Sequence, residues 1–479
     1  MKIKLFAAVA AVALLGACSS GEKKQKIQPL KVSDNQRFLV TADGKPFMWL
    51  GCTAWLLHKL DREQMEQYLE NRRALGFNVI QTSVLHGLNV RNAYGHRAVI
   101  NRDASRPLVT PGNDPADSAQ YDYWDHLDYA VDLAASKGIY MGIVPVWGSS
   151  VKGGLVSREQ AEAYAKFLAE RYANRNNVLW LNGGDIMGTD STETWNIIGN
   201  TLRKYAPNHL ITFHPFGRSR SSQWFHDAPW LDFNMVQSGH RTYEQDPNGI
   251  GQDVWRHITT DYNLTPAKPT VDGEPSYEEI PHGLHNWHME RYRQLRPKDY
   301  TKDMEQPRWQ AGDIRRYAYW SVFAGGLGFT YGHASIMQML LPTDRIPGAY
   351  NATTTWIDAL NAEGGTQMQH LKNLMLSRPF LERVPDNSLV ANQGEKYSHI
   401  QATRGENYAF LYTYRGGEVK VNMGKINGGR VKASWFNPRN GELVEVGSIK
   451  IEGEDVATFT TPVPEPNDGN DWVLILDAE

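Results

Sequence analysis

The 479-residue sequence predicts an α/β protein, a (β/α)8 TIM barrel followed by a small antiparallel β-sandwich. Between residues 46 and 332, eight short apolar segments typical of buried strands alternate with segments of helical periodicity. From about residue 384 the pattern changes to short strands joined by Asn-Gly, Gly-Gly and Pro-Glu-Pro turns, which is typical of a sandwich. We therefore assign residues 30–380 to the barrel and 381–479 to the sandwich.

The barrel strands are expected in regularly spaced apolar runs. They are residues 46–51, 77–85, 139–147, 178–181, 210–214, 231–237, 268–271 and 328–332. The helices are expected at residues 61–76, 123–138, 157–174, 192–205, 222–228, 251–262, 313–324 and 356–375. A doubly wound open sheet is the alternative, but the turn after the first strand reads Cys-Thr-Ala-Trp and lacks a Gly-x-Gly phosphate loop.

The first 29 residues are expected to direct export. Lys2 and Lys4 precede an apolar run, residues 5–17, that is too short to span a bilayer. The run ends in the motif Leu-Gly-Ala-Cys18. This end resembles a bacterial lipobox, which implies cleavage before Cys18 and acylation of its thiol; an ordinary signal peptide is the alternative. Residues 1–18 are then a lipoprotein signal peptide and 19–29 a flexible tether, which predicts an exported lipoprotein.

Charge and cysteine content limit the partners of this chain. The 50 basic and 53 acidic residues leave a net charge of −3, so the sequence has no electrostatic footprint for nucleic acid. Beyond Cys18 only Cys52 remains, which excludes an internal disulfide and a cysteine metal cluster. Cys52 lies in an apolar strand end, where a packed small residue is the expected role.

Two acidic residues follow barrel strands at glycine-rich turns. Asp185 ends the stretch Val178-Leu-Trp-Leu-Asn-Gly-Gly-Asp, and Glu274 ends Lys268-Pro-Thr-Val-Asp-Gly-Glu before a proline. These are the fourth and seventh strands, which lie on opposite sides of a barrel mouth. Two carboxylates that face each other across a cleft are what glycoside hydrolysis requires. A turn or surface acid is the alternative at each position.

Polar and aromatic residues follow most of the other strands. Their side chains suit hydrogen bonding to sugar hydroxyls or stacking on sugar rings, although buried polar networks and core packing explain such residues equally well. The predicted substrate-binding residues are His86, Trp147, Asn182, His214, Gln237, His240, Tyr277, Tyr331 and His333.

A histidine cluster in the long segment 276–307 is the candidate for a metal site. His282, His285 and His288 are spaced by three residues, which places them on one rough face of a helix. No acid or cysteine stands at the spacing of a known zinc motif, so a loop beside the cleft or a solvated surface is preferred. We expect neither a metal nor a cofactor.

Three motifs together resemble the apiosidase-like proteins of glycoside hydrolase family 140. They are Leu-Asn-Gly-Gly-Asp185, Val-Asp-Gly-Glu274-Pro and the hairpin Trp435-Phe-Asn-Pro-Arg-Asn-Gly-Glu442. The resemblance covers the chain from about residue 30. It implies a retaining glycosidase with Asp185 as acid/base and Glu274 as nucleophile. It also implies an apiose-containing substrate from the rhamnogalacturonan II side chains of plant pectin, and a place in the outer membrane.

One departure narrows this prediction. Related barrel glycosidases mostly carry Asn-Glu at the end of the fourth strand, whereas here Asp185 follows two glycines. This argues against a generic cellulase or mannanase. The predicted function is an endo-apiosidase-like hydrolase, with the pKa of Asp185 raised and Glu274 kept ionised. The alternatives are a retaining glycosidase for another plant glycoside, a glycan-binding surface lipoprotein with an inactive barrel, and a metal-dependent hydrolase that uses the His282 cluster.

Overall fold

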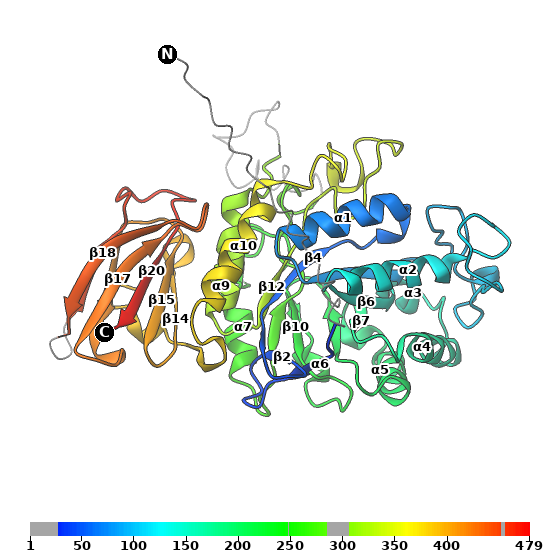
Figure 1. Ribbon diagram of the computed structural model, residues 1–479, viewed down its shortest axis with the longest axis horizontal. Coiled ribbons are helices and arrows are strands. Elements are labelled where there is room, and N and C mark those ends of the chain that lie inside the picture. Colours follow the sequence, from blue (N-terminus) through cyan, green and yellow to red (C-terminus); the bar gives the residue numbers. More distant parts are fainter. Residues whose placement is uncertain (1–26, 248, 285–305, 452–455) are drawn as a thin grey trace, which may run out of the picture.

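The computed structural model describes residues 27–247, 249–284, 306–451 and 456–479, which form a barrel and an antiparallel sheet domain (Figure 1). Cys18, His285 and His288 lie outside the described residues, so the lipobox and most of the histidine cluster stay predictions. Among the residues that the structure describes, no helix is both long and apolar enough to cross a membrane.

A nearly closed barrel confirms the predicted fold class. In the described part of the chain, its sheet runs in the order β8-β7-β6-β5-β4-β12-β11-β10-β9, and every strand but β9 (Ser219–Arg220) is parallel to its neighbour. The parallel strands are β4 (Trp49–Thr53), β5 (Val79–Leu85), β6 (Tyr140–Val146), β7 (Val178–Ile186), β8 (Ile211–Pro215), β10 (Asn234–Gln237), β11 (Thr270–Asp272) and β12 (Gly328–Tyr331). Between β8 and β10, the Asp232 amide donates to the Ile211 carbonyl at 2.9 Å, which brings the two ends of the sheet together.

Helices cover the outside of the barrel (Figure 1). The main ones are α1 (Arg62–Ala74), α2 (Tyr123–Ser136), α4 (Arg158–Tyr172), α5 (Thr192–Tyr205), α7 (Trp255–Tyr262) and α9 (Ala311–Phe323), with the short α3 (Gly148–Lys152) and α6 (Ser222–Phe225) between them. Helix α4 begins at a capping box, because Ser157 accepts from the Gln160 amide and Gln160 accepts from the Ser157 amide. Buried apolar side chains from strands and helices form one continuous core.

Several elements begin or end at residues other than those predicted. The first barrel strand starts at Trp49, because Pro46–Phe47 (β3) joins a small antiparallel sheet with β1 (Leu30–Val32) and β2 (Leu39–Thr41). Strand β7 continues past Leu181 to Ile186. The helix expected at 356–375 is only α10 (Glu363–Leu376). It begins there because the Gly364 amide donates to the buried carboxylate of Glu278 at 2.9 Å.

The C-terminal domain is antiparallel, as predicted. A six-stranded sheet contains β13 (Val384–Pro385), β14 (Ile400–Arg404), β15 (Tyr408–Thr413), β20 (Trp472–Ala478), β17 (Arg430–Phe436) and β18 (Leu443–Lys450), in that order. Strands β16 (Glu418–Asn422) and β19 (Val456–Thr460) form a second sheet. Apolar side chains of both sheets share one buried cluster, which is the core of a small sandwich.

Helix α9 joins the two domains through buried contacts. It lies between the barrel and the sheet domain (Figure 1), where Arg315 binds both carboxylate oxygens of Asp471 at 2.8 Å. The rings of Tyr319 and Tyr412 stack with their centroids 4.7 Å apart. A buried bidentate ion pair and a ring stack make this a fixed junction rather than a flexible linker.

Candidate active site

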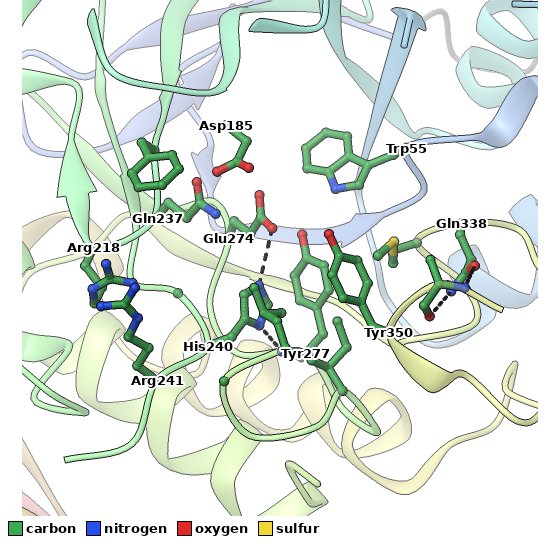
Figure 2. Close-up of a pocket in the computed structure, with 18 of the residues that line it drawn as sticks. Trp55, Asp185, Arg218, Gln237, His240, Arg241, Glu274, Tyr277, Gln338 and Tyr350 are labelled. Atoms are coloured by element: carbon green, nitrogen blue, oxygen red, sulfur yellow. Dashed lines mark hydrogen bonds and ion pairs between the residues drawn. The ribbon is translucent and has the colours of Figure 1, made fainter. Parts of the chain in front are cut away.

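A cavity of about 450 Å³ opens at the carboxyl ends of the barrel strands (Figure 2). This is the end at which barrel enzymes place their active sites. Asp185 after β7 and Glu274 after β11 both line it, and Figure 2 shows their carboxylates facing the same space. The two strand ends that the sequence singles out therefore converge on one cavity.

Two histidines hold the Glu274 carboxylate, one at each oxygen. His240 Nε2 forms a hydrogen bond to Glu274 Oε1 at 3.4 Å. His214 Nε2 lies 3.1 Å from Oε2, which is within ion-pair distance, although the pair lacks the alignment of a hydrogen bond. Glu274 and both imidazoles are buried.

The backbone sets the orientation of both imidazole rings. The Asp185 amide donates to His214 Nδ1 at 3.2 Å, and the Tyr277 amide donates to His240 Nδ1 at 3.4 Å. Because a backbone N–H can only donate, each Nδ1 is an acceptor and the proton of each neutral ring is on Nε2. Both Nε2–H groups therefore point towards the Glu274 carboxylate.

The surroundings of Glu274 keep it ionised. Burial alone would raise its pKa, but the contacts from His214 and His240 outweigh burial and lower the pKa to about 2. A buried carboxylate that stays negative at neutral pH is a suitable nucleophile for an anomeric carbon.

Backbone geometry at the end of β7 turns Asp185 into the cavity. Gly183 and Gly184 have φ of 95° and 102°, and Asp185 itself has φ of 49°. A Cβ on Gly183 would lie 2.7 Å from the His214 carbonyl oxygen, and one on Gly184 would lie 3.0 Å from Val144. The two glycines are therefore required both by the left-handed backbone and by the close packing.

Asp185 has the opposite electrostatic environment to Glu274. Burial raises its pKa first, and the negative charge of Glu274 raises it further, against smaller opposing effects of His214, Gln237 and His240. Two acids in one cavity, one with a lowered and one with a raised pKa, divide naturally into an ionised group and a proton donor. These are the directions that the sequence predicts.

Aromatic rings line the other side of the cavity. Trp147 packs edge to face against Trp55 with centroids 5.2 Å apart, and its centroid lies 4.6 Å from that of the His86 ring. Tyr277 and Tyr350 add two further rings (Figure 2). Flat faces of this kind stack on sugar rings.

The structure brings most of the predicted residues to this cavity. Besides the two acids, its lining includes His86, Trp147, Gln237, His240 and Tyr277. His214 lies directly behind, between Asp185 and Glu274.

Three predicted substrate-binding residues do not reach the cavity. Asn182 donates to the Trp195 carbonyl at 2.8 Å, and Tyr331 donates to Glu278 at 2.6 Å. His333 Nδ1 accepts from the Ser335 amide at 3.0 Å. All three are buried and none lines the cavity, so their role in substrate binding stays a prediction. Position at a strand end does not distinguish a side chain that faces the cavity from one that faces the surrounding protein.

Sequence reasoning missed several lining residues. Trp55 ends the first-strand motif Cys-Thr-Ala-Trp, and the rule applied to the other strands would have found it. Three other lining residues lie in loops beyond the strand ends, where no sequence pattern marks them: Arg218, Arg241 and Tyr350. Among the described residues no group of three metal-ligating side chains occurs, and the His282 ring instead packs on Trp309, with centroids 4.1 Å apart.

Known structures resemble this chain over nearly its full length. A solved structure titled "Glycoside hydrolase" shares 42% identity, with a TM-score of 0.84, 94% of this chain covered and 97% of the other. A glycoside hydrolase family 5 structure from Bacteroides vulgatus ATCC 8482 shares 41% identity, with a TM-score of 0.84 and coverage of 95% and 94%. No curated protein sequence matches the chain.

The fold, the paired carboxylates and these relatives define the chain as a glycoside hydrolase. Residues 33–382 match the family model described as "Apiosidase-like, catalytic domain", and the chain belongs to this family. Residues 384–477 match a model described as "Putative collagen-binding domain of a collagenase". The resemblance to apiosidase-like proteins that the sequence motifs indicate is thereby confirmed.

Proposed function

We propose that this glycoside hydrolase acts with retention of anomeric configuration, with Glu274 as nucleophile and Asp185 as acid/base. The observation that carries the proposal is the opposite perturbation of the two acids in one cavity. The pKa of Glu274 is lowered to about 2 and that of Asp185 is raised. The first step of a double displacement needs this difference.

In the first step, the Glu274 carboxylate attacks the anomeric carbon while protonated Asp185 gives its proton to the glycosidic oxygen. The leaving alcohol departs, and the sugar remains bound to Glu274 as an ester. Esterification removes the negative charge that raises the pKa of Asp185. The Asp185 carboxylate is therefore suited to take a proton from water in the second step, and that water releases the sugar and restores both acids.

The proposed substrate is an apiose-containing side chain of rhamnogalacturonan II in plant pectin. The family description supports apiose, and the aromatic wall formed by Trp55, Trp147 and Tyr350 supports a sugar ring in the cavity. We also propose that the protein is anchored to the outer membrane through acylated Cys18, on the strength of the Leu-Gly-Ala-Cys18 motif. Incorporation of labelled palmitate, and its loss in Cys18→Ala, tests the anchor.

The substrate is tested by product analysis after digestion of an apiose-containing pectin fragment, set against simple β-glucans. Product is expected from the pectin fragment only, and its anomeric configuration, followed by NMR, should match that of the substrate. A barrel that only binds glycan would show affinity for the fragment without product over long incubation. Product from another plant glycoside alone would contradict the apiose assignment and leave the retaining mechanism standing.

The residue roles are tested by amide substitutions that keep size and remove charge. Glu274→Gln and Asp185→Asn are each expected to lower kcat by about a hundredfold or more while the thermal unfolding temperature stays close to that of the wild type. Glu279→Gln is the matched control, because Glu279 lies five residues further on and does not line the cavity. Near-normal activity of Glu274→Gln would show that the nucleophile is assigned wrongly.

A further inference from the structure

The loop after β10 carries His240, one of the two histidines that hold Glu274 (Figure 2). It comprises residues 238–254, from the end of β10 to the start of α7, and its described residues include no helix or strand. Gly239, His240 and Arg241 of this loop line the cavity. A connection of this length without secondary structure is uncommon in a compact domain and is usually functional. Contacts that fix the rest of the loop therefore bear on the position of His240.

The outer part of the loop, from Tyr243 to Asp253, folds back on itself in its described residues. The Tyr243 hydroxyl donates to Asp253 Oδ1 at 2.5 Å, and the Gly251 amide donates to Asp246 Oδ2 at 3.1 Å. Gly251 has φ of 59°, and a Cβ at this position would lie 2.5 Å from the Tyr243 ring. These contacts join the two ends of the outer part into one compact unit, which begins shortly after His240.

Tyr397 of the sheet domain contacts both ends of this outer part. It lies in the short turn η7 (Lys396–Ser398) before β14, and its ring packs on the core of the barrel. The Gln252 side-chain amide donates to the Tyr397 hydroxyl at 2.9 Å, and the rings of Tyr397 and Tyr243 meet edge to face with centroids 5.3 Å apart. Gln252 is itself buried, and its side-chain oxygen accepts from Arg316 of α9 at 2.6 Å. The hydroxyl and the ring of Tyr397 thus each fix one end of the outer part.

Neighbours of Tyr397 extend this contact in both directions. The Lys396 ammonium group lies 5.3 Å from the centroid of the Tyr243 ring. The His399 ring stacks on Trp255, the first residue of α7, with centroids 4.3 Å apart and planes within 7° of parallel. The sheet domain therefore contacts the outer part of the loop and the helix that follows it.

We propose that Tyr397 is a positioning residue of the active site, which fixes the outer part of the loop and so holds His240 against Glu274. The sheet domain then takes part in catalysis, because it supports a loop whose inner residues line the cavity. The inference rests on the proposed function in that Glu274 is taken as the nucleophile.

The contact between His240 and Glu274 is sensitive to small movements of the loop. His240 Nε2 lies 3.4 Å from Glu274 Oε1, near the long limit of a hydrogen bond, so a displacement of about a few tenths of an ångström removes it. The Gly283 amide donates to the His240 carbonyl at 2.9 Å, which fixes the backbone at this residue. The course of the chain beyond it depends on the outer part, which Tyr397 holds.

The test compares three variants of the full-length protein. Tyr397→Ala removes both contacts with the loop, whereas Tyr397→Phe removes the hydrogen bond to Gln252 and keeps the ring against Tyr243. Tyr408→Ala is the matched control, because Tyr408 is also a sheet-domain tyrosine at the domain junction, and its hydroxyl donates to the Pro379 carbonyl at 3.0 Å. If Tyr397→Ala proves unfolded, Tyr397→Leu, which fills much of the space without a hydrogen bond, replaces it.

The first measurement is the pKa of Glu274, and it needs no substrate. It is followed by NMR on protein whose glutamates carry carbon-13 at Cδ, and the signal is assigned by its absence from Glu274→Gln. In Tyr397→Ala the pKa should rise above the wild-type value of about 2, because one of the two histidines that lower it is displaced. The pKa should stay close to the wild-type value in Tyr408→Ala, and its rise in Tyr397→Phe should be smaller than in Tyr397→Ala.

The second measurement is kcat/KM for the proposed substrate at pH 4 and at pH 7. Relative to the wild type, the ratio of the pH 4 value to the pH 7 value should fall about twofold or more in Tyr397→Ala, because more Glu274 is protonated at pH 4. The ratio should recover in Tyr397→Phe. In a His240→Leu background, adding Tyr397→Ala should change neither the ratio nor the pKa, because the contact that Tyr397 supports is already gone.

Two results would overturn the positioning role. One is a Glu274 pKa that is the same in Tyr397→Ala as in the wild type, with a lowered unfolding temperature alone, since that describes a purely structural contact. The other is a full rise of the pKa when Tyr397→Ala is added to His240→Leu, since the effect would then not pass through His240.

Failure of the proposed function gives a different result. A pKa of Glu274 that rises in Tyr397→Ala while kcat/KM at pH 4 is unchanged would support the positioning role and refute Glu274 as the nucleophile. If the wild type hydrolyses no apiose glycan, the substrate assignment fails, and the NMR titration alone decides the role of Tyr397.

Discussion

His214 is expected to control the acid side of the pH profile through its contact with Glu274. The substitution His214→Leu removes the Nε2–H that lies 3.1 Å from Glu274 Oε2. His214→Gln is the matched control, because its amide nitrogen can donate from about the position of Nε2. The His214 ring also packs on Trp55 and Trp147, with centroids 5.1 and 6.3 Å apart, so the two variants are compared with each other as well as with the wild type.

The size of the effect follows from the pKa of Glu274. The pKa of Glu274 falls from the usual 4.5 to about 2, which corresponds to about 3 kcal/mol in favour of the ionised form. Contacts with two histidines supply this stabilisation against the cost of burial. Without His214, burial is opposed by His240 alone and the pKa rises. If it returns only to 4.5, about three quarters of Glu274 is protonated at pH 4, and kcat/KM falls about fourfold relative to the wild type.

The assay is kcat/KM for the proposed substrate between pH 4 and pH 7, expressed as the ratio of variant to wild type. The ratio for His214→Leu should fall as pH drops below about 5, because the carboxylate that attacks the sugar becomes protonated. The ratio for His214→Gln should stay nearly level. Level ratios for both variants would show that His214 does not hold Glu274 ionised, and an equal fall in both would point to lost packing instead.

Further predictions concern the proton donor, its support and the domain junction. Activity should fall as pH rises through the raised pKa of Asp185, since the first step needs its proton, and Asp185→Asn should flatten this alkaline limb of kcat/KM. Gly184→Ala should lower activity and cost about 1 kcal/mol or more of stability in chemical denaturation, because a side chain is strained at φ of 102° and would press on Val144. Arg315→Ala should cost about 2 kcal/mol or more, because the buried Asp471 loses its bidentate partner and keeps only Arg439 at 3.5 Å and the Tyr412 hydroxyl at 3.2 Å, whereas the exposed Arg430→Ala should cost little.

The barrel was predictable because its pattern is local. Short apolar strands and capped helices each follow from neighbouring residues, as the Ser157 capping box shows. The predicted bounds of an element were wrong where they depend on a contact with a residue far away in the sequence. The helix beginning at Glu363 depends on the buried carboxylate of Glu278, some 85 positions earlier, and no local pattern near residue 356 reports that contact.

The candidate site likewise contains residues that local sequence patterns identify and residues whose direction depends on distant contacts. Asp185 and Glu274 were found because glycine-rich turns after apolar strands mark residues that project from a barrel. Asn182, Tyr331 and His333 occupy comparable positions and point into the surrounding protein, because the direction of a side chain depends on strand tilt and on its neighbours.

The sequence by itself determined the barrel, the antiparallel domain, the two acids and the family to which they point. The sequence also predicts the directions of their pKa shifts, but only the tertiary structure decided which contacts produce them. Two imidazoles oriented by the Asp185 and Tyr277 amides converge on Glu274, and burial beside that charge raises the pKa of Asp185. The physical reason is that a pKa depends on solvent exclusion and on charges a few ångströms away, and residues brought that close here are far apart along the chain.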